Sequence, residues 1–505
     1  MDAERIKAWL KNKYNFTFLL IIVAAILFRG YYFFVTNNQP LWWDEASYMS
    51  VAKSYAGIGY STLESIRSSG FPRTMSLFYL LGITNESVIR FFGLYLPAII
   101  LLVLTYVLLS KMYQDKRIAL IGTVIMAVLW ENVFYSNRFH TENLALIFQY
   151  LAVIFLLKLY GPSKPKSKLW TIVLLVASTI LVFWYRPGNV LFIPAMIAFA
   201  LIMHVSEFMS TKKRKLTTTA GLLALIALFF ISLNTESPLI KAYYHPELPI
   251  SWNSFNVFLG FFKSPINWLP SIFFYTFLIG LIGALFAIYL YFPKIVKEPR
   301  ALSQTMKSNI FNLLLLLSVM GGFVVFIRPE AFEYRWFFPL LPALLSFASI
   351  GVVNFSDWLS NKINKKSLSI FILLVIVFLG AYTQMSIVDP LVKQKASTYS
   401  QVKEAGLWLK QNTAINEVVL STSKPQIAFY SERETVTYAG MTVEEFENFL
   451  AERKPHYMMA SLFEGNPEWL QSWLDANIKN NRLIPMQGYV MKNQTVAIIY
   501  RIGTE

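Results

Sequence analysis

The sequence has no cysteine, few charged residues and few histidines. Without cysteine the chain forms no disulfide, no thiolate metal site and no cysteine nucleophile. Charged residues make up 15% of the 505 residues, whereas a soluble domain has about 25%. The four histidines are scattered, and His140 with Glu142 forms only a weak metal-like pair. The sequence therefore predicts no metal site and no cofactor.

Hydrophobic residues are correspondingly abundant. They make up 55% of the chain, and aromatic residues make up 16%. This composition predicts a polytopic membrane protein whose helices end in Trp and Tyr anchors. Eleven apolar runs approach the roughly 20 residues that cross a bilayer. We expect these spans at 14–35, 88–110, 118–135, 144–160, 169–185, 189–205, 216–233, 268–292, 310–328, 336–354 and 368–387.

Basic residues between the spans indicate how the chain is oriented. Lys and Arg cluster before the first span and after the second, fourth, sixth, eighth and tenth. Because basic loops stay in the cytoplasm, we expect a cytoplasmic N-terminus and a long first outer loop at 36–87. The net charge of +16 lies in these loops, so it predicts no nucleic-acid partner. The first span lacks a small-residue cleavage site and is expected to be a retained anchor in the plasma membrane.

The composition becomes that of a soluble domain from about residue 399, with basic and acidic residues in nearly equal numbers. The fold class that we expect is an all-α polytopic membrane domain of about 11 transmembrane helices over residues 1–387, followed by a small extracytoplasmic α/β domain over residues 388–505. A lid, a scaffold or acceptor recognition suits this second domain better than a second active site. Its expected helices are 401–410, 443–450 and 469–478, and its expected strands are 418–421, 436–438 and 496–501.

Two acids follow the first span in the stretch Trp42-Trp43-Asp44-Glu45. Carboxylates at a membrane surface are costly unless they face water, a cation or a reacting group. The spacing of aromatic and apolar residues from Trp43 to Tyr55 predicts a helix that lies along the membrane surface. The alternative is a purely structural role, in which Asp44 is a helix N-cap and Glu45 only complements the helix dipole.

Arginines gather at the outer ends of later spans. Arg138, Arg186, Arg328 and Arg335 all stand on the side where the positive-inside rule disfavours them. One such arginine is usually explained by snorkelling or by pairing with phospholipid. Four of them indicate a phosphate site, because guanidinium binds phosphate through two parallel hydrogen bonds. Beside the acids, they suggest a phosphate-bearing lipid and a proton acceptor.

Together these motifs resemble the GT-C membrane glycosyltransferases. The closest likeness is to the branch with the lipid A aminoarabinose transferase and the dolichyl-phosphate-mannose protein mannosyltransferases. The likeness departs in the first loop, where many members have His-Pro-Pro and this chain has Gly70-Phe71-Pro72-Arg73. It also departs at Glu142, where relatives often have Asp. It rests on Asp44-Glu45-Ala46-Ser47-Tyr48, on Arg138 to Glu142, on Tyr185-Arg186-Pro187-Gly188, and on Glu333 to Pro342.

The resemblance implies transfer of a monosaccharide from a polyprenyl-phosphate donor at the outer face, with inversion and without a metal. Mannose is the expected sugar, with aminoarabinose and galactose as alternatives, and the acceptor is a glycolipid, a lipid-linked oligosaccharide or a protein. Asp44 is the expected base, with Glu45 and Glu142 as further catalytic acids. The expected phosphate ligands are Arg138, Arg186 and Arg335, and the expected substrate-binding residues are Tyr48, Arg73, His140, Glu333 and Tyr334.

Two other functions stay open. A transporter or flippase of lipid-linked glycans also needs outward arginines and polar helix breaks. It should, however, carry polar groups near mid-membrane, where these runs are largely apolar. An oligosaccharyltransferase or glycan ligase would use a lipid-pyrophosphate donor in place of a monophosphate donor.

Overall fold

A computed structural model describes residues 3–62, 68–161, 167–208, 272–322 and 334–503. The chain divides into two compact units, which are treated separately below. The first unit comprises 1–32, 95–136 and 141–391, and the second comprises 33–94, 137–140 and 392–505. The first outer loop therefore groups with the C-terminal part of the chain. The expected domain boundary at residues 387 and 388 stays a prediction.

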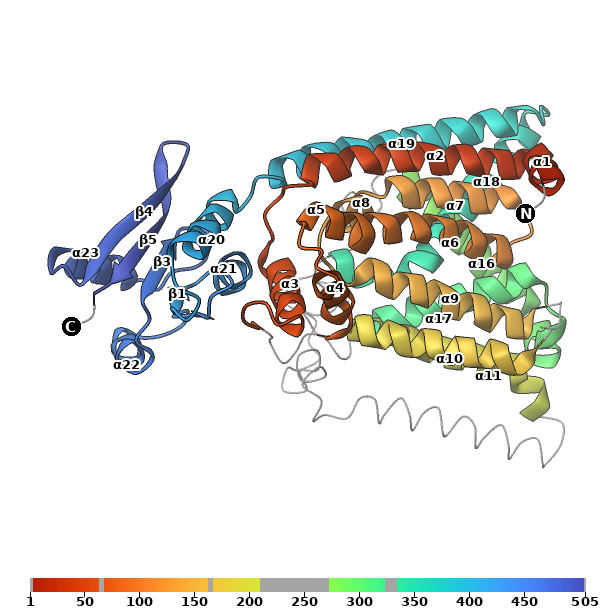
Figure 1. The fold of residues 1–505 in the computed structure, drawn as a ribbon. Coiled ribbons are helices and arrows are strands. Elements are labelled where there is room, and N and C mark those ends of the chain that lie inside the picture. Colours follow the sequence, from red (N-terminus) through yellow and green to blue (C-terminus); the bar gives the residue numbers. More distant parts are fainter. Residues whose placement is uncertain (1–2, 63–67, 162–166, 209–271, 323–333, 504–505) are drawn as a thin grey trace. The chain divides into compact units, whose positions relative to one another are not determined.

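The first unit is helical throughout its described residues (Figure 1). Short 3-10 turns η2 (Pro187–Leu191), η3 (Pro299–Ala301) and η5 (Tyr334–Leu340) connect or begin helices. Its α-helices are α1 (Ala3–Lys11), α2 (Lys13–Thr36), α6 (Leu96–Met112), α7 (Lys116–Val128), α8 (Trp130–Ser136), α9 (Glu142–Tyr160), α10 (Lys168–Tyr185), α11 (Phe192–Phe208), α16 (Ile272–Lys297), α17 (Gln304–Gly322), α18 (Leu341–Lys362) and α19 (Leu368–Lys395).

Eight described helices are long and apolar enough to cross a membrane, or nine if α7 and α8 form one span bent by 55°. Most of the expected spans coincide with these helices. The expected span 310–328 falls on α17, which is not among the eight, and 216–233 lies outside the described residues. The total of eleven spans therefore stays a prediction.

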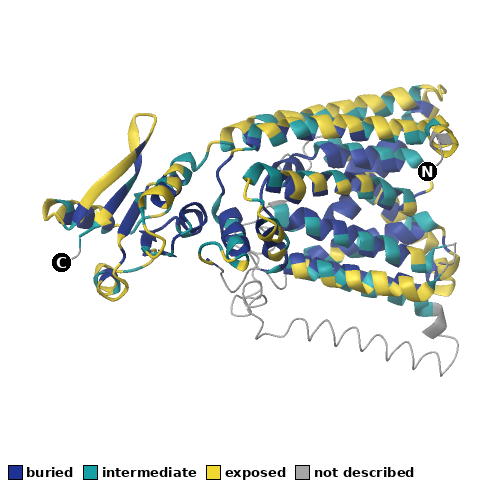
Figure 2. Cartoon of the chain, viewed as in Figure 1, coloured by how far each residue is buried: buried dark blue, intermediate teal, exposed yellow. Residues whose placement is uncertain are grey.

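Large apolar side chains cover the outer surface of these helices. Leu27 of α2 is 70% exposed, and Phe378 of α19 is also 70% exposed. Figure 2 shows exposed stripes along α2 and α19, while α18 is buried. Apolar surface of this extent is unfavourable in water and favourable in lipid. The chain is therefore a multi-pass membrane protein.

Small residues bring α16 and the buried helix α18 into close contact. A Cβ atom at Gly280 would overlap the backbone of Phe347, and one at Gly351 would overlap the backbone of Thr276. Such glycines let two helix backbones pack directly against each other, which is how membrane helices associate without a hydrophobic driving force.

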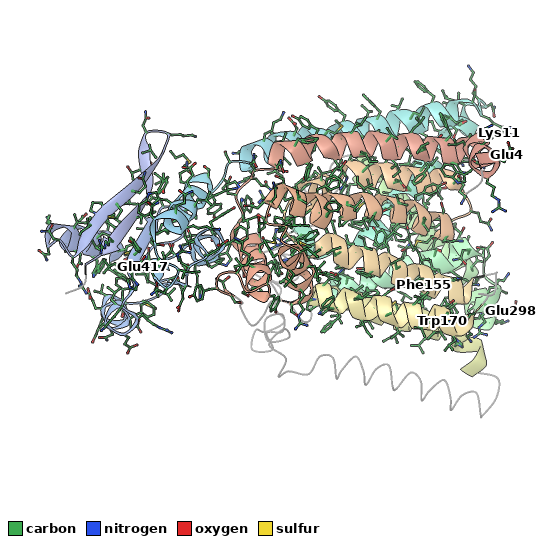
Figure 3. All side chains as sticks on the ribbon, viewed as in Figure 1. Glu4, Lys11, Phe155, Trp170, Glu298 and Glu417 are labelled. Atoms are coloured by element: carbon green, nitrogen blue, oxygen red, sulfur yellow. The ribbon has the colours of Figure 1, made fainter. Side chains whose placement is uncertain are left out.

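The exposed charged side chains of Glu4, Lys11 and Glu298 lie at one end of the helical unit (Figure 3). These positions flank the ends of spans that the basic pattern places in the cytoplasm. The cytoplasmic N-terminus and the extracytoplasmic C-terminal domain nevertheless stay predictions.

The second unit combines the first outer loop with a five-stranded sheet and its helices. In the loop, α3 (Trp43–Tyr55) and α4 (Gly70–Leu80) pack together, and α5 (Glu86–Arg90) leads through the π-helical turn η1 (Phe91–Tyr95) into α6. The helix expected after Trp43 is confirmed. The remaining elements are α20 (Ser400–Asn412), β1 (Val419–Ser421), α21 (Lys424–Ser431), β2 (Thr435–Val436), α22 (Val443–Arg453), β3 (Tyr457–Ser461), α23 (Leu470–Lys479), β4 (Leu483–Met491) and β5 (Gln494–Ile502).

The sheet has the strand order β2-β1-β3-β5-β4, with β1 parallel to β2 and β3, and β5 antiparallel to β3 and β4. Because successive strand residues face opposite sides, Val419 packs with Ile427 of α21 in one core. Its neighbour Leu420 packs with Phe446 of α22 in the other core. Helices on both faces of the sheet confirm the expected α/β class of this region.

Helix α21 packs against α3 within the second unit. The Lys53 Nζ atom donates to the Glu432 Oε1 atom at 2.7 Å and to the Phe429 carbonyl at 2.9 Å. Near the other end of the contact, the Leu41 amide donates to the Tyr430 hydroxyl at 2.9 Å. These bonds tie the sheet domain to the segment that carries Asp44.

The charges at this contact stabilise each other. Burial opposes ionisation of Glu432, but hydrogen bonds from Lys410 and Lys53 outweigh it and hold the pKa of Glu432 below its ordinary value. Burial also lowers the pKa of Lys53, and the hydrogen bond to Glu432 works against that shift. The contribution of Glu432 to stability is therefore present at neutral pH and is lost as the pH falls through its depressed pKa.

Candidate functional site

The expected site residues fall into two groups, one in each compact unit. The first group surrounds the start of α3, where Trp42 is the N-cap residue. The Glu45 Oε2 atom accepts a hydrogen bond from the Trp42 amide at 2.8 Å, which satisfies one donor left open at the helix start. Asp44 stands in the first turn and is half-buried. The alternative that Asp44 is the N-cap is therefore wrong.

Glu45 is fully buried and forms an ion pair with Arg138. The Arg138 Nη1 atom donates to the Glu45 Oε2 atom at 3.0 Å, and the Phe139 amide donates to the Oε1 atom at 2.9 Å. The two side chains are 0% and 1% exposed. Both carboxylate oxygens of Glu45 are thus engaged, and the pair fixes the segment 137–140 against α3.

Aromatic rings and backbone carbonyls complete this cluster. The guanidinium carbon of Arg138 lies 3.5 Å from the centre of the Trp42 ring, as in a cation–π contact. Arg90 is also buried and donates to the carbonyls of Gln39 at 2.8 Å and Asn137 at 3.1 Å. Arg90 was not predicted from the sequence. Its only signal there is that it adds one more basic residue on the predicted outer side.

The predicted substrate residues of this unit differ in burial and in their contacts. Tyr48 is half-buried with its ring edge-on to Phe71, and Arg73 is exposed with its guanidinium 5.7 Å from the Tyr55 ring centre. His140 is buried, and its amide donates to the Arg138 carbonyl. Their roles in substrate binding stay predictions.

The second group belongs to the helical unit and centres on Glu142, the first residue of α9. The Arg186 Nη1 atom donates to the Glu142 Oε1 atom at 2.5 Å and to the Thr141 hydroxyl at 3.3 Å. The Arg335 Nε atom lies 3.9 Å from the same carboxylate oxygen. Glu142 is 2% exposed, and each arginine side chain is 13% exposed. The structure thus brings together three residues that the sequence places far apart.

One oxygen of Glu142 is still available. Its buried Oε2 atom has no hydrogen-bond partner among the residues that the structure describes. A buried carboxylate oxygen without a partner is costly, so it is a ready acceptor for a ligand hydroxyl. Arg186 engages only its Nη1 atom in the described hydrogen bonds, which leaves its other N–H groups as donors.

Gln149 holds the three chain segments of this cluster in place. It lies seven residues after Glu142, on the same face of α9. Its Nε2 atom donates to the Pro339 carbonyl at 2.8 Å, and its Oε1 atom accepts from the Asn189 Nδ2 atom at 3.0 Å. Asn189 lies in η2, which begins directly after Arg186, and Pro339 lies in η5, which also contains Arg335. One buried amide therefore fixes both arginine-bearing turns.

Polar groups inside the spans were also missed from sequence. Arg29 of α2 is buried and donates to the Met126 carbonyl and the Asn132 Oδ1 atom, both at 2.7 Å, and to Ser136 at 2.9 Å. Glu131, beside this network in the sequence, is buried, and neither carboxylate oxygen has a hydrogen-bond partner among the described residues. The spans are thus less purely apolar than expected.

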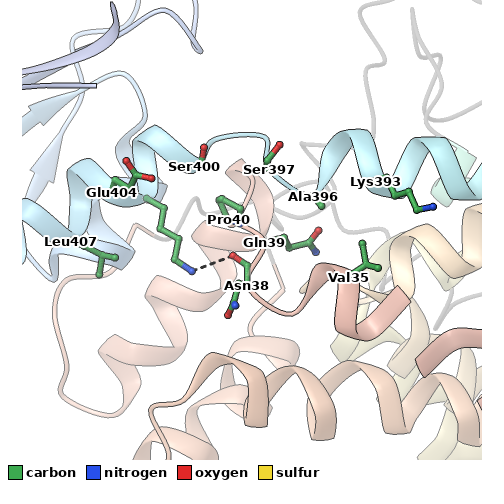
Figure 4. Close-up of a pocket in the computed structure, with 11 residues that line it drawn as sticks. Val35, Asn38, Gln39, Pro40, Lys393, Ala396, Ser397, Ser400, Glu404 and Leu407 are labelled. Atoms are coloured by element: carbon green, nitrogen blue, oxygen red, sulfur yellow. Dashed lines mark hydrogen bonds between the residues drawn. The ribbon is translucent and has the colours of Figure 1, made fainter. Parts of the chain in front are cut away.

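A cavity of about 520 Å³ opens beside the segment that precedes α3 (Figure 4). Asn38 and Gln39 line one side, and Ser397, Ser400 and Lys403 line the other. The Lys403 Nζ atom reaches the Asn38 carbonyl at 3.5 Å. All of these residues belong to the second unit.

Other expected residues cannot be placed in either group. Glu333 and Arg328 lie outside the described residues, and Tyr334 is the first residue of η5. No group of three or more His, Asp or Glu side chains suited to a metal ion occurs among the residues that the structure describes. Independence from metals stays a prediction.

Comparison with known proteins identifies the fold. No family model and no curated protein sequence matches the chain. ArnT from Cupriavidus metallidurans matches in its apo state with a TM-score of 0.54 and 12% identity over 96% of this chain and 99% of that one. ArnT bound to undecaprenyl phosphate matches with a TM-score of 0.54 and 11% identity, and the match covers 95% of this chain and 97% of ArnT. A third match is the archaeal oligosaccharyltransferase AglB from Archaeoglobus fulgidus, in complex with an inhibitory peptide and a dolichol-phosphate. Its TM-score is 0.58 at 11% identity, and the match covers 98% of this chain and 75% of AglB.

All of these neighbours are GT-C glycosyltransferases. At such low identity the likeness establishes the fold, and it extends over both the membrane helices and the C-terminal domain. The chain is therefore a membrane protein with the GT-C glycosyltransferase fold, as the sequence motifs predict.

We expect replacement of Gln149 by Leu to disturb the Glu142 cluster without direct contact to it. The change removes two buried hydrogen bonds and should cost about 1–2 kcal/mol of stability. It should also free the turns that carry Arg186 and Arg335. Thermal unfolding in detergent and binding of a polyprenyl phosphate measure the two effects.

The matched control is Gln384→Leu, since Gln384 is also buried in this unit and accepts a hydrogen bond from the Trp130 amide. Gln384→Leu should lower stability to a similar extent and leave lipid-phosphate affinity unchanged. Equal loss of affinity in both variants would show that Gln149 has no specific link to the arginine turns.

Proposed function

We propose that the chain transfers a monosaccharide, mannose or a similar sugar, from a polyprenyl-phosphate donor to a hydroxyl of an acceptor at the outer membrane face. The single observation that carries the proposal is the cluster in which Arg186 and Arg335 converge on the buried Glu142. The acceptor is a glycan, a lipid or a protein.

The composition of this cluster supports a lipid phosphate. Guanidinium groups do not lose their charge, and their N–H groups match phosphate oxygens in pairs. Arg186 and Arg335 are partly exposed, and the Glu142 Oε1 atom orients the Arg186 side chain. The open Oε2 atom of Glu142 then accepts a hydroxyl of the bound sugar or acceptor. Phosphate binding and sugar orientation follow from these three residues.

Asp44 is the proposed base. It stands in the first turn of α3, where the positive end of the helix dipole favours an ionised carboxylate. The neighbouring Glu45 uses both of its oxygens in buried hydrogen bonds, so we assign Glu45 a positioning role. Arg138 is its buried partner and is likewise proposed to position α3 in place of the phosphate-binding role expected from sequence.

The reaction balances with these groups alone. The acceptor oxygen forms a bond to the anomeric carbon while the bond from that carbon to the phosphate oxygen breaks. The acceptor proton passes to Asp44, and the lipid leaves as a phosphate anion held by arginine. Because phosphate is a stable leaving group, no strong general acid is needed, in contrast to glycoside hydrolysis. One displacement inverts the anomeric carbon.

Replacement of Asp44 by Asn should abolish sugar transfer and preserve the fold. Loss of a general base lowers kcat by about 10²–10⁴-fold. The measurement is transfer of a labelled sugar in reconstituted vesicles, beside the thermal unfolding of each variant. Asp475→Asn, the same chemical change at an exposed position of α23, should leave transfer unchanged.

Replacement of Glu45 by Gln should instead destabilise the fold, because it leaves buried Arg138 without its carboxylate. We expect about 3–5 kcal/mol lower stability, as for other broken buried pairs. Full activity of the Asp44 variant would contradict the assignment of the base. A Glu45 variant as stable as the wild type would contradict the positioning role.

Arg335→Ala should mainly weaken donor binding. Loss of one charged hydrogen bond raises the Kd of a polyprenyl phosphate about tenfold or more. Lipid binding in nanodiscs measures this change, with Arg453→Ala on the exposed face of α22 as the control. An unchanged Kd in the Arg335 variant would remove this residue from the phosphate site.

A further inference from the structure

A second cavity of the sheet-containing unit, of about 390 Å³, lies between the first outer loop and the C-terminal domain. Lys53 of α3 and Tyr79 of α4 line it from the loop, together with Thr84 and Glu86. Lys410 of α20, together with Phe429, Tyr430 and Glu432, lines it from the other side. Its volume lies in the range of sites for small molecules.

The charges in the wall compensate each other. The Glu432 Oε1 atom lies 2.7 Å from the Lys53 Nζ atom and 2.8 Å from the Lys410 Nζ atom. Glu86 lies 3.7 Å from Lys403 and 3.8 Å from Arg90. Two lysines and two glutamates line the cavity, so it offers no net charge to an ion. The wall is suited to a neutral ligand that makes many hydrogen bonds.

Two polar atoms of residues in the wall lack hydrogen bonds among the described residues. The Tyr79 hydroxyl is buried, with the residue 4% exposed, and it has no hydrogen-bond partner among the residues that the structure describes. The Glu86 Oε2 atom also has no hydrogen bond there, although it lies 3.8 Å from the Arg90 Nη2 atom in an ion pair. Burial raises the pKa of Tyr79, and nearby Glu86 and Glu432 add to this, so its hydroxyl stays protonated as a donor. A donor and an acceptor of the residues that line the cavity therefore have no hydrogen bond among the described residues.

Aromatic and apolar groups complete the lining. Phe429 and Tyr430 stand beside Leu407 and Ile58 in the wall. Apolar ring surface next to charged hydrogen-bonding groups suits a sugar, which has C–H faces and hydroxyl edges. An inorganic anion would gain nothing from the rings, and a purely apolar ligand would leave Tyr79 and Glu86 unsatisfied.

We propose that this cavity binds a neutral sugar unit of the acceptor. The inference rests on the proposed function and specifies its acceptor as an oligosaccharide chain. Lys53 follows Asp44 by nine residues on α3, which is about 13.5 Å at 1.5 Å per residue. This distance is longer than one monosaccharide. The acceptor hydroxyl at Asp44 and the sugar in the cavity therefore belong to different units of one chain.

The test uses the purified full chain in nanodiscs. The probes are mannose, inorganic phosphate and the neutral tetrasaccharides mannotetraose, maltotetraose and chitotetraose, and binding is followed by saturation-transfer NMR. We expect at least one tetrasaccharide to bind, and Tyr79→Phe to raise its Kd about tenfold, the effect of one lost hydrogen bond. The variant should melt at the wild-type temperature or above, since it removes only an unpartnered hydroxyl.

Tyr438→Phe is the matched control, because Tyr438 is a buried tyrosine of the same unit that does not line this cavity. It should bind the tetrasaccharide as the wild type does. The inference is overturned if no tetrasaccharide binds, if Tyr79→Phe binds as tightly as the wild type, or if phosphate competes for the cavity.

Asp44→Asn separates this inference from the proposed function. The variant should bind the tetrasaccharide normally, because binding does not need the base. In the wild-type chain, normal tetrasaccharide binding without any sugar transfer would leave the sugar site standing and refute the proposed function. Sugar transfer without tetrasaccharide binding would support the proposed function and refute the sugar site.

Discussion

The buried pair of Glu45 and Arg138 is the interaction on which the candidate site depends. Both side chains are almost inaccessible to water, and the carboxylate also accepts hydrogen bonds from two backbone amides. Two charges removed from water are stabilised by their mutual attraction and by hydrogen bonds, which here reach both oxygens of the carboxylate. These bonds join the start of α3, whose first turn carries Asp44, to the segment 137–140. Four residues beyond Arg138 in the chain, Glu142 opens the helix that holds the arginine cluster.

Buried polar side chains play the same role inside the helical unit. Gln149 fixes two turns, and Arg29 joins α2 to α7 and α8 through Met126, Asn132 and Ser136. In lipid such groups must satisfy each other, so each one specifies which helices are neighbours. The arrangement favours a rigid binding site over a polar transport path, since Arg29 and Gln149 bond to backbone and side chains of their own bundle.

The sequence predicted the long, strongly periodic elements well. The apolar runs that end at Tyr160 and Tyr185 became α9 and α10, and α20, α22 and α23 lie where amphipathic spacing placed them. It missed α21, β3 and β4. The stretch Lys424–Ser431 is short and buried on nearly all sides, so it shows no polar and apolar faces to reveal its period.

The candidate site was predicted in part. Glu142, Arg186 and Arg335 were expected together from the resemblance, and the structure brings them into contact. The roles of Glu45 and Arg138 could not be separated from those of Asp44, because only three-dimensional burial distinguishes a locked carboxylate from an accessible one. Gln149 and Tyr79 gave no signal, and Arg90 gave only that of one more basic residue, since the roles of all three depend on segments that are distant in the sequence.

Donor chemistry tests the account most directly. Purified chain in vesicles is given the same labelled sugar on a polyprenyl monophosphate or on a polyprenyl pyrophosphate, with an oligosaccharide acceptor. The account predicts that label passes to the acceptor from the monophosphate alone, with release of the polyprenyl phosphate. Transfer from the pyrophosphate alone would identify an oligosaccharyltransferase or ligase. Movement of the lipid across the membrane without transfer would contradict the account altogether.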